Sequence, residues 1–476
     1  MTIKIKEYLK KSTLNVEYFI ITILLISAFL PRTYLPYITV IITGIIYLII
    51  SRKNFYGKQY LYFAIGLIAL SIISWLYNFF VYKDIDFLGL MLWWLTYLFP
   101  FLVLILVSSL SLRVNIRKVV KIYIYILLFE FFIIFFQAIQ ENKLWGDFAT
   151  GTCWNAHALG IHFAIGIIIT LSEVFQKDNK NIGITLFFLL ILYLGLIITA
   201  YKAQIVILLP ILVLFFFYKL IRKIIIYKKQ VKKYIRYVSA FIVVLVVSVV
   251  TVMFTYVLGD VQTSVKLSVE NVNKIEENYD IENWQYLERW GGKIYSYRVA
   301  FLDVPKEINY ISGYGPSTYT SRASELRMKK MTYYIVSVIA PRFNLSEDKI
   351  KSISNFISKE NSRVFEKYLG KIRFRSTLNA PMASVISIWV EIGVLGLGFF
   401  IFFFIYLFIR LRNARRSQIK NKDFSYLILN QYSVLLLMFF IINLFYLNYW
   451  EYPEMVIPVM TFIILSSAYG KRSKSF

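Results

Sequence analysis

Residues 383–409 read ASVISIWVEIGVLGLGFFIFFFIYLFI, and residues 410–422 directly after them read RLRNARRSQIKNK. A bilayer core requires roughly 20 mostly apolar residues in a helix, so the first stretch is long enough to cross a membrane. The basic stretch that follows is typical of a cytoplasmic loop. Together they predict an integral membrane protein, with Glu391 as the acidic side chain inside this span.

The composition agrees with a membrane protein. Of the 476 residues, 58% are hydrophobic and 17% are charged, whereas roughly a quarter of a soluble domain is charged. Lys and Arg outnumber Asp and Glu by 53 to 27, which gives a formal net charge of +26. Because the cations cluster between apolar runs, we interpret them as determinants of membrane orientation and expect no nucleic-acid partner.

The same length criterion, applied to the whole chain, predicts about twelve spans. They lie near residues 16–31, 34–50, 61–81, 88–110, 122–139, 157–175, 183–199, 205–218, 237–258, 383–409, 426–447 and 456–469. With the N-terminus in the cytoplasm, the inner segments hold 30 Lys and Arg and the short outer loops hold 4. The positive-inside rule therefore predicts that both termini are cytoplasmic.

This topology divides the chain into membrane helices at 1–258 and 383–476 and an outer domain at 259–382. A segment of this length is too long for a simple connector and is expected to fold. Ser346 is a candidate N-cap, apolar residues recur after it with helical spacing, and Gly370 is a candidate C-terminal signal. We expect a helical outer domain, with a second amphipathic helix near 321–338.

Several kinds of chemistry lack their sequence signals. Cys153 is the single cysteine, so an internal disulfide and a Cys-rich metal site are excluded. His157 and His162 would lie about 140° apart on a helix, which is a poor arrangement for zinc. Phosphate-loop, metalloprotease and dinucleotide motifs are absent from the sequence, and we expect no metal or cofactor.

Ionisable side chains within membrane spans are costly and therefore indicate candidate functional residues. They are Glu130, His162 and Glu391. The simpler alternative is that each is hydrogen-bonded between helices or protonated. Lys202 lies in a tight outer turn, where it is a candidate ligand for a phosphate at headgroup depth or, alternatively, an interface lysine whose ammonium reaches water.

The outer domain contains two further candidate binding regions. Arg289 and Arg298, with Lys293 between them, carry cationic groups suited to phosphate. The segment Gly313-Tyr314-Gly315 permits a tight turn with close backbone approach, Tyr314 provides a ring for stacking on sugars, and Arg322 follows it. The alternative is an ordinary Gly-Pro turn on a basic surface.

Four segments, taken in order, resemble a known family. They are GTCWNAHALG at 151–160, TAYKA at 199–203, the stretch from Arg289 through Tyr295 to Gly313-Tyr314-Gly315, and WVEIGVLG at 389–396. They are similar to the Gly-Thr-x-x-Asn-x-Asn, Ser-Arg-Gly, Gly-Arg…Trp…Gly-x-Gly and Glu-x-Gly-Ile-x-Gly patterns of the O-antigen ligase and polymerase superfamily. These bacterial enzymes act on undecaprenyl-pyrophosphate-linked glycans. The resemblance implies an all-α, GT-C-like glycosyltransferase architecture in the bacterial cytoplasmic membrane.

Three departures from the family pattern favour a polymerase over a lipid A ligase. Met382 and Ala383 stand where ligase-like members have a His-Asn pair before the Glu-x-Gly motif. Lys202 stands in place of the arginine of Ser-Arg-Gly, and His157 in place of the second asparagine of the first motif.

The resemblance implies metal-independent transfer of glycan from a lipid-linked donor to a second lipid-linked repeat unit. Arg289, Arg298 and Lys202 would hold the diphosphate. Either His157, which we favour, or Glu391 would be the general base. The implied partners are the undecaprenyl-pyrophosphate-linked oligosaccharide, membrane lipids, a chain-length regulator and a flippase. Two other functions are open: a ligase that transfers glycan to another acceptor, and a flippase or transporter of the lipid-linked glycan.

Overall fold

The structure is a computed structural model in which parts of the chain are described. The described residues are 16–31, 35–51, 57–82, 87–110, 114–143, 146, 148–174, 182–199, 201, 203–213, 286–287, 297, 299–303, 310–319, 321, 323, 346, 373–374, 383–421 and 424–467.

The described chain is almost entirely helical. Its labelled helices are α2 (Leu35–Ser51), α3 (Lys58–Tyr82), α4 (Phe87–Tyr97), α5 (Phe99–Leu110), α6 (Ile116–Gln140), α7 (Ala156–Val174), α8 (Ile182–Ile198), α18 (Ser384–Lys420), α19 (Phe424–Leu444) and α20 (Pro453–Ser467). Two further apolar helices occupy Val16–Ser27 and Ala203–Val213. A helix is thus present in each expected span except 237–258, which lies outside the described residues.

Four of the described helical segments are long and apolar enough to cross a membrane. They are Lys58–Val81, Phe87–Leu110, Ile116–Gln140 and Ser384–Lys420. Their surfaces carry many exposed aromatic and aliphatic side chains, such as Phe129, Phe132 and Phe136 on α6. Apolar surface of this kind is expected to face lipid.

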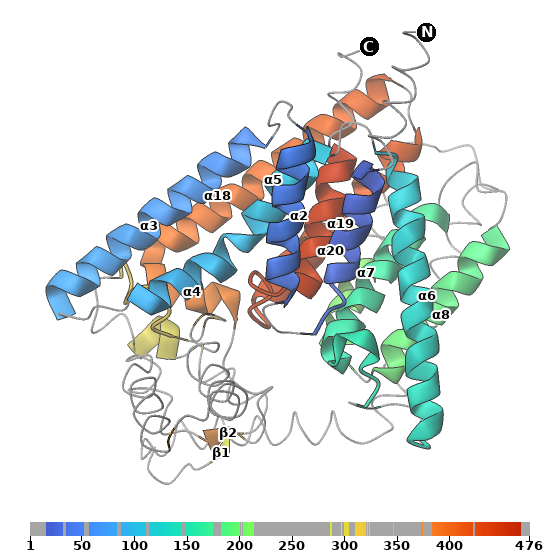
Figure 1. Ribbon diagram of the computed structural model, residues 1–476, viewed down its shortest axis with the longest axis horizontal. Coiled ribbons are helices and arrows are strands. Elements are labelled where there is room, and N and C mark those ends of the chain that lie inside the picture. Colours follow the sequence, from blue (N-terminus) through green and yellow to red (C-terminus); the bar gives the residue numbers. More distant parts are fainter. Residues whose placement is uncertain are drawn as a thin grey trace.

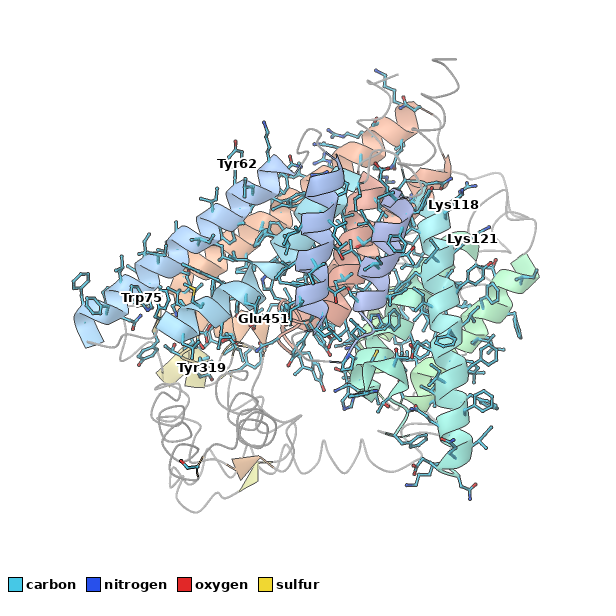
Figure 2. All side chains as sticks on the ribbon, in the orientation of Figure 1. Tyr62, Trp75, Lys118, Lys121, Tyr319 and Glu451 are labelled. Atoms are coloured by element: carbon cyan, nitrogen blue, oxygen red, sulfur yellow. The ribbon has the colours of Figure 1, made fainter. Side chains whose placement is uncertain are left out.

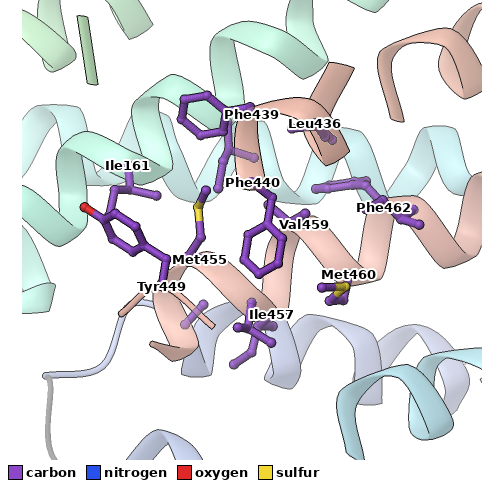
Figure 3. Packing of buried hydrophobic residues seen from close by; sticks show 14 of the residues in the cluster. Ile161, Leu436, Phe439, Phe440, Tyr449, Met455, Ile457, Val459, Met460 and Phe462 are labelled. Atoms are coloured by element: carbon purple, nitrogen blue, oxygen red, sulfur yellow. The ribbon is translucent and has the colours of Figure 1, made fainter. Parts of the chain in front are cut away.

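Helix α20 lies at the centre of the bundle. All fifteen of its residues are buried, as expected for a helix that is apolar on every side and packed on every side. It contacts α5, α7, α18 and α19, and Figure 1 shows it between α3 and α18 on one side and α6, α7 and α8 on the other. Figure 3 shows the core around it, where Met455, Val459 and Phe462 of α20 meet Phe439 and Phe440 of α19.

Two expected spans are interrupted. The span predicted at 88–110 consists of α4 and α5, which meet at Leu98. Pro100 lies in the first turn of α5, a position where the missing N–H of proline is tolerated and the preceding chain is turned away from helical geometry. The span predicted at 383–409 lies within α18 but is broken at Gly393, whose backbone angles (φ 73°, ψ −159°) are not helical.

Short pieces of 259–382, the segment expected to form the outer domain and called the outer segment below, are described. A π-helical turn, η3 (Val299–Asp303), packs on α18, where the Trp389 indole donates a hydrogen bond to the Ala300 carbonyl at 2.8 Å. Strands β1 (Tyr286–Leu287) and β2 (Arg373–Phe374) pair in parallel. The helices expected at 321–338 and 346–370 lie outside the described residues, apart from single positions at 321, 323 and 346.

Candidate functional site

The outer segment 310–319 inserts its backbone into the break in α18. The N–H groups of Tyr314 and Gly315 donate to the carbonyls of Val390 and Glu391 at 2.8 and 2.9 Å. In return, the carbonyls of Tyr310 and Ile311 accept from Val394 and Leu395 at 2.9 and 3.4 Å; these residues follow the break. Backbone groups that the broken helix leaves unpaired are thereby satisfied, as buried backbone groups require.

Glycines permit this close approach. Gly313 and Gly393 have φ values of +71° and +73°, which L-residues with side chains rarely adopt. A β-carbon on Gly313 would lie 2.6 Å from the carbonyl carbon of Glu391. Ser74 of α3 closes the junction, because its hydroxyl lies 2.5 Å from the Ser312 carbonyl oxygen and 2.9 Å from that of Glu391.

The Glu391 carboxylate is fully buried and accepts hydrogen bonds on both oxygens. Its Oε2 accepts from the Trp93 indole N–H at 2.8 Å, and its Oε1 accepts from the Tyr319 backbone N–H at 3.1 Å. The Ser321 side chain and the Ser317 backbone also interact with it. Hydrogen bonds to both oxygens fix the position of the carboxyl group, so this geometry favours an anchoring role for Glu391.

A second buried carboxylate, Glu451, lies in the loop between α19 and α20. Its Oε2 accepts from the Thr96 hydroxyl at 2.7 Å and from the Ala323 backbone N–H at 3.3 Å. Its backbone carbonyl accepts from the Tyr37 hydroxyl at 2.6 Å. Glu451 therefore connects α4, α2 and the outer segment.

The motif at 151–157 forms a tight turn between α6 and α7. Residues Gly151–Cys153 make a single 3₁₀ turn, η1. Glu130 of α6 accepts from the Thr152 backbone N–H at 2.9 Å and from the Thr152 hydroxyl. Asn155 then caps α7, because its side-chain oxygen accepts from the Ala158 N–H at 2.9 Å. Thus Glu130 holds the turn, and Asn155 starts the helix that carries His157.

His157 lies beside the turn that precedes the helix Ala203–Val213. The centroids of its ring and the Tyr201 ring are 4.5 Å apart. The Tyr201 hydroxyl contacts the Tyr449 hydroxyl, and the Gln204 amide donates to the Tyr449 hydroxyl at 3.4 Å and to Asn443 Oδ1 at 2.7 Å. The first two family-like segments therefore meet each other and the loop between α19 and α20.

Residues 445–452, which form the loop between α19 and α20, connect the surroundings of His157 to the outer segment. Tyr449 reaches Tyr201, and Glu451 reaches the outer segment at Ala323. Its backbone is fixed on the first turn of α18, where the Trp450 N–H donates to the Ser384 hydroxyl at 3.1 Å. The Trp450 indole donates to the Tyr97 carbonyl at 3.0 Å. The ring packs among Phe101, Phe400, Phe403, Phe404 and Phe440.

The site lies toward one end of the bundle. Figure 2 shows Tyr319 and Glu451 nearer the end that faces the β1–β2 pair, and Lys118 and Lys121 of α6 nearer the opposite end. The polar site and the basic start of α6 therefore lie toward different ends of the bundle.

The other histidine, His162, has a structural environment. Its Nε2 lies 3.0 Å from the Ala28 carbonyl and its Nδ1 lies 3.0 Å from the Tyr123 hydroxyl. Since a carbonyl can only accept, Nε2 carries a proton and donates a hydrogen bond to Ala28, while Nδ1 pairs with the Tyr123 hydroxyl. The ring stacks on Phe29 at 3.9 Å. The simpler interpretation, a histidine hydrogen-bonded between helices, therefore fits His162.

Three of the eight predicted site residues are described: His157, Tyr314 and Glu391. Tyr314 and Glu391 belong to the same junction, and the loop 445–452 links that junction to the surroundings of His157. The remaining five lie outside the described residues: Lys202, Arg289, Lys293, Arg298 and Arg322. Within the part of the chain that is described, no group of three or more His, Cys, Asp or Glu could hold a metal ion.

Glu451 is a site residue that the sequence analysis missed. It falls between the expected spans 426–447 and 456–469 and was therefore treated as part of a loop. An available signal was the composition of that loop, Tyr-Trp-Glu-Tyr-Pro-Glu at 449–454, which places two carboxylates in an aromatic run between apolar spans. Such acids are costly to desolvate and therefore require partners.

Neither a scan against models of protein families nor a search of curated proteins finds a match to this chain. The fold and site define the protein as a helical protein of membrane type. Its polar site is built at one end of the bundle from turns between helices and from residues 310–319, 321 and 323.

Proposed function

We propose that the protein is a glycosyltransferase that polymerises a bacterial surface polysaccharide of the O-antigen or capsule type. It would transfer glycan from an undecaprenyl-pyrophosphate-linked donor to a second lipid-linked repeat unit at the outer face of the cytoplasmic membrane. In this proposal the whole chain has about twelve membrane helices in a GT-C-like arrangement, with both termini in the cytoplasm.

One observation carries the proposal: the family-like segments are in contact, although they are distant in sequence. Segment 151–160 contacts 199–203 through His157 and Tyr201. Segment 313–315 is hydrogen-bonded to 389–396, and the loop 445–452 joins the two pairs. Segments that act on one substrate are expected to meet in this way, since catalysis requires the reacting groups to be held together.

The proposed reaction needs charge stabilisation and proton removal. The diphosphate of the carrier is a good leaving group, and Arg289, Arg298 and Lys202 would stabilise its charge as it departs. Lys293 and Arg322 would contribute further positive charge. Fixed cations serve here in the role that a divalent metal plays in other phosphate-leaving reactions.

His157 is the general base in this proposal. An unperturbed imidazole titrates near physiological pH and suits removal of a proton from the acceptor hydroxyl. Glu391 is the weaker candidate, because donors from Trp93 and Tyr319 already engage both of its oxygens. We therefore assign Glu391 to holding the site and His157 to proton transfer.

The direct test uses purified full-length protein in detergent, incubated with a lipid-linked repeat unit of the host glycan. The expected product is a ladder of lipid-linked oligomers that grows with time and fails to form with Arg289→Ala. Recovery of single repeat units alone, from folded protein, would contradict a polymerase.

Deletion of the gene distinguishes the related functions in cells. Loss of a polymerase leaves single repeat units at the outer face, whereas loss of a ligase leaves full-length polymer on its carrier lipid. Loss of a flippase leaves lipid-linked units at the inner face. Chemical analysis of the surface glycan and of the carrier-linked pool separates the three.

A further inference from the structure

Two buried carboxylates from different parts of the chain bind the same piece of the outer segment. Glu391 accepts the Tyr319 N–H and Glu451 accepts the Ala323 N–H, at 3.1 and 3.3 Å. The two amides are four residues apart, whereas the two carboxylates are sixty residues apart in sequence. The outer segment is thus held at two successive points by acids of the membrane bundle.

The last turns of α4 set the spacing between these carboxylates. Trp93 donates to Glu391 Oε2 at 2.8 Å, and Thr96 donates to Glu451 Oε2 at 2.7 Å. Tyr97 stacks on Trp93 with ring centroids 4.1 Å apart and planes 8° apart, and its phenol lies next to the Glu451 carboxylate. One face of α4 therefore contacts both acids.

Burial makes these contacts strongly dependent on one another. Both carboxylates are fully shielded from solvent, and a buried charge is costly unless donors surround it. Some of those donors are backbone N–H groups of the outer segment. Removal of the segment would leave each acid short of a donor, and removal of an acid would leave a buried N–H without its acceptor.

We propose that Glu391 and Glu451 are a pair of positioning residues that seat the outer segment 310–323 on α4 and α18. We call this pair the clamp: Glu391 binds the Tyr319 N–H, and Glu451 binds the Ala323 N–H. This inference goes beyond the proposed enzyme activity, because the clamp is defined by contacts within the chain and its test requires no substrate. A result that contradicts the clamp would therefore leave the proposed activity untouched, and a result that contradicts the activity would leave the clamp untouched.

Hydrogen exchange of the 310–323 amides, followed by mass spectrometry on full-length protein in detergent, reports the seating. Both oxygens of Glu391 accept N–H bonds, and glutamine offers only one acceptor oxygen. Glu391→Gln should therefore raise exchange in 310–323 about tenfold. Peptides from α7 and α20 should keep their protection.

Glu451 permits a rescue test, because the Thr96 and Ala323 bonds to its side chain both end on Oε2. Glu451→Met removes the acceptor at similar size and should raise exchange in 310–323. Glu451→Gln retains a carbonyl oxygen for Thr96 and Ala323 and should restore most of the protection. If Glu451 acted by packing alone, Glu451→Met would not raise the exchange of 310–323 above that of Glu451→Gln.

Glu130→Gln is the matched control, since Glu130 is a buried carboxylate that binds Thr152. It should leave exchange in 310–323 unchanged. The proposal is overturned if 310–323 stays protected in both Glu391→Gln and Glu451→Met. It is also overturned if protection is lost equally in α7 and α20, which would indicate a general role in folding. If Glu391→Gln does not fold, hydrogen exchange of 310–323 in Glu451→Met and Glu451→Gln tests the proposal.

Discussion

Gly393 and Tyr310 lie so close that a β-carbon on Gly393 would come within 2.5 Å of the Tyr310 carbonyl oxygen. The same carbonyl accepts the N–H of Val394 at 2.9 Å. The break in α18 and the docking of the outer segment are therefore one feature, since the helix opens at the residue where the other backbone enters. Broken helices of this kind line functional cavities in many membrane proteins.

Gly393→Ala should destabilise the protein by about 3 kcal/mol, because the new β-carbon would meet two backbone carbonyls in a conformation that favours glycine. Thermal unfolding in detergent measures this change. Gly398→Ala is the control within the same helix, because a β-carbon there meets nothing within 4 Å, and it should unfold near the wild-type temperature. Equal unfolding temperatures for the two variants would contradict the described junction.

Glu130→Gln should lower the proposed transferase activity about tenfold while the protein stays folded, because it weakens the turn that precedes His157. Glu130 accepts from both the backbone N–H and the hydroxyl of Thr152, and glutamine provides one acceptor oxygen instead of two. The rate of oligomer formation measures the effect. Thr152→Val removes the hydroxyl donor and should give a smaller loss, so a larger loss from this variant would count against the explanation.

The positions of the helices could be predicted because a membrane helix has a fixed length and an apolar composition. The span expected at 61–81 is α3 at Lys58–Tyr82, and the span expected at 34–50 is α2 at Leu35–Ser51. The break at Gly393 could not be predicted in this way, because the residues on both sides of it are apolar. Its determinant is the backbone of the outer segment, nearly eighty residues earlier in the chain.

The site was predictable where a polar side chain stands out within an apolar run, as Glu391 does. Its partners were not predictable, because Tyr319 and Ala323 contribute backbone N–H groups that are independent of residue type. Glycines carried part of the signal: Gly313 was interpreted as permitting close backbone approach, and it lies against α18 at Glu391. Glu451 was missed because the criterion for costly charges was applied to spans and not to the loops that pack between them.

Tyr201 and Tyr449 should be energetically coupled, because their hydroxyls contact each other in a buried environment. Each single change to phenylalanine should cost about 1 kcal/mol. The double change should cost less than the sum of the two, as expected for residues that share one interaction. Thermal unfolding of the four proteins in the cycle gives the coupling energy. Additive effects would contradict direct contact between the 199–203 turn and the 445–452 loop.

The two histidines should respond in opposite ways to substitution. His157→Asn should lower the proposed polymerisation rate about 100-fold with little effect on unfolding, because asparagine cannot accept the proton that the imidazole removes. His162→Ala should destabilise the protein by about 3 kcal/mol, because it leaves the Tyr123 hydroxyl and the Ala28 carbonyl without their partner and opens a cavity beside Phe29.

Oligomer formation and thermal unfolding, measured on the same preparations, check both expectations. A His157→Asn protein that polymerises at the wild-type rate would remove His157 as the base, although the rest of the site could still bind substrate. A His162→Ala protein with normal stability but no activity would reverse the assignment of the two residues. In that case the proton acceptor would lie within the helix bundle, at the Tyr123–His162 pair.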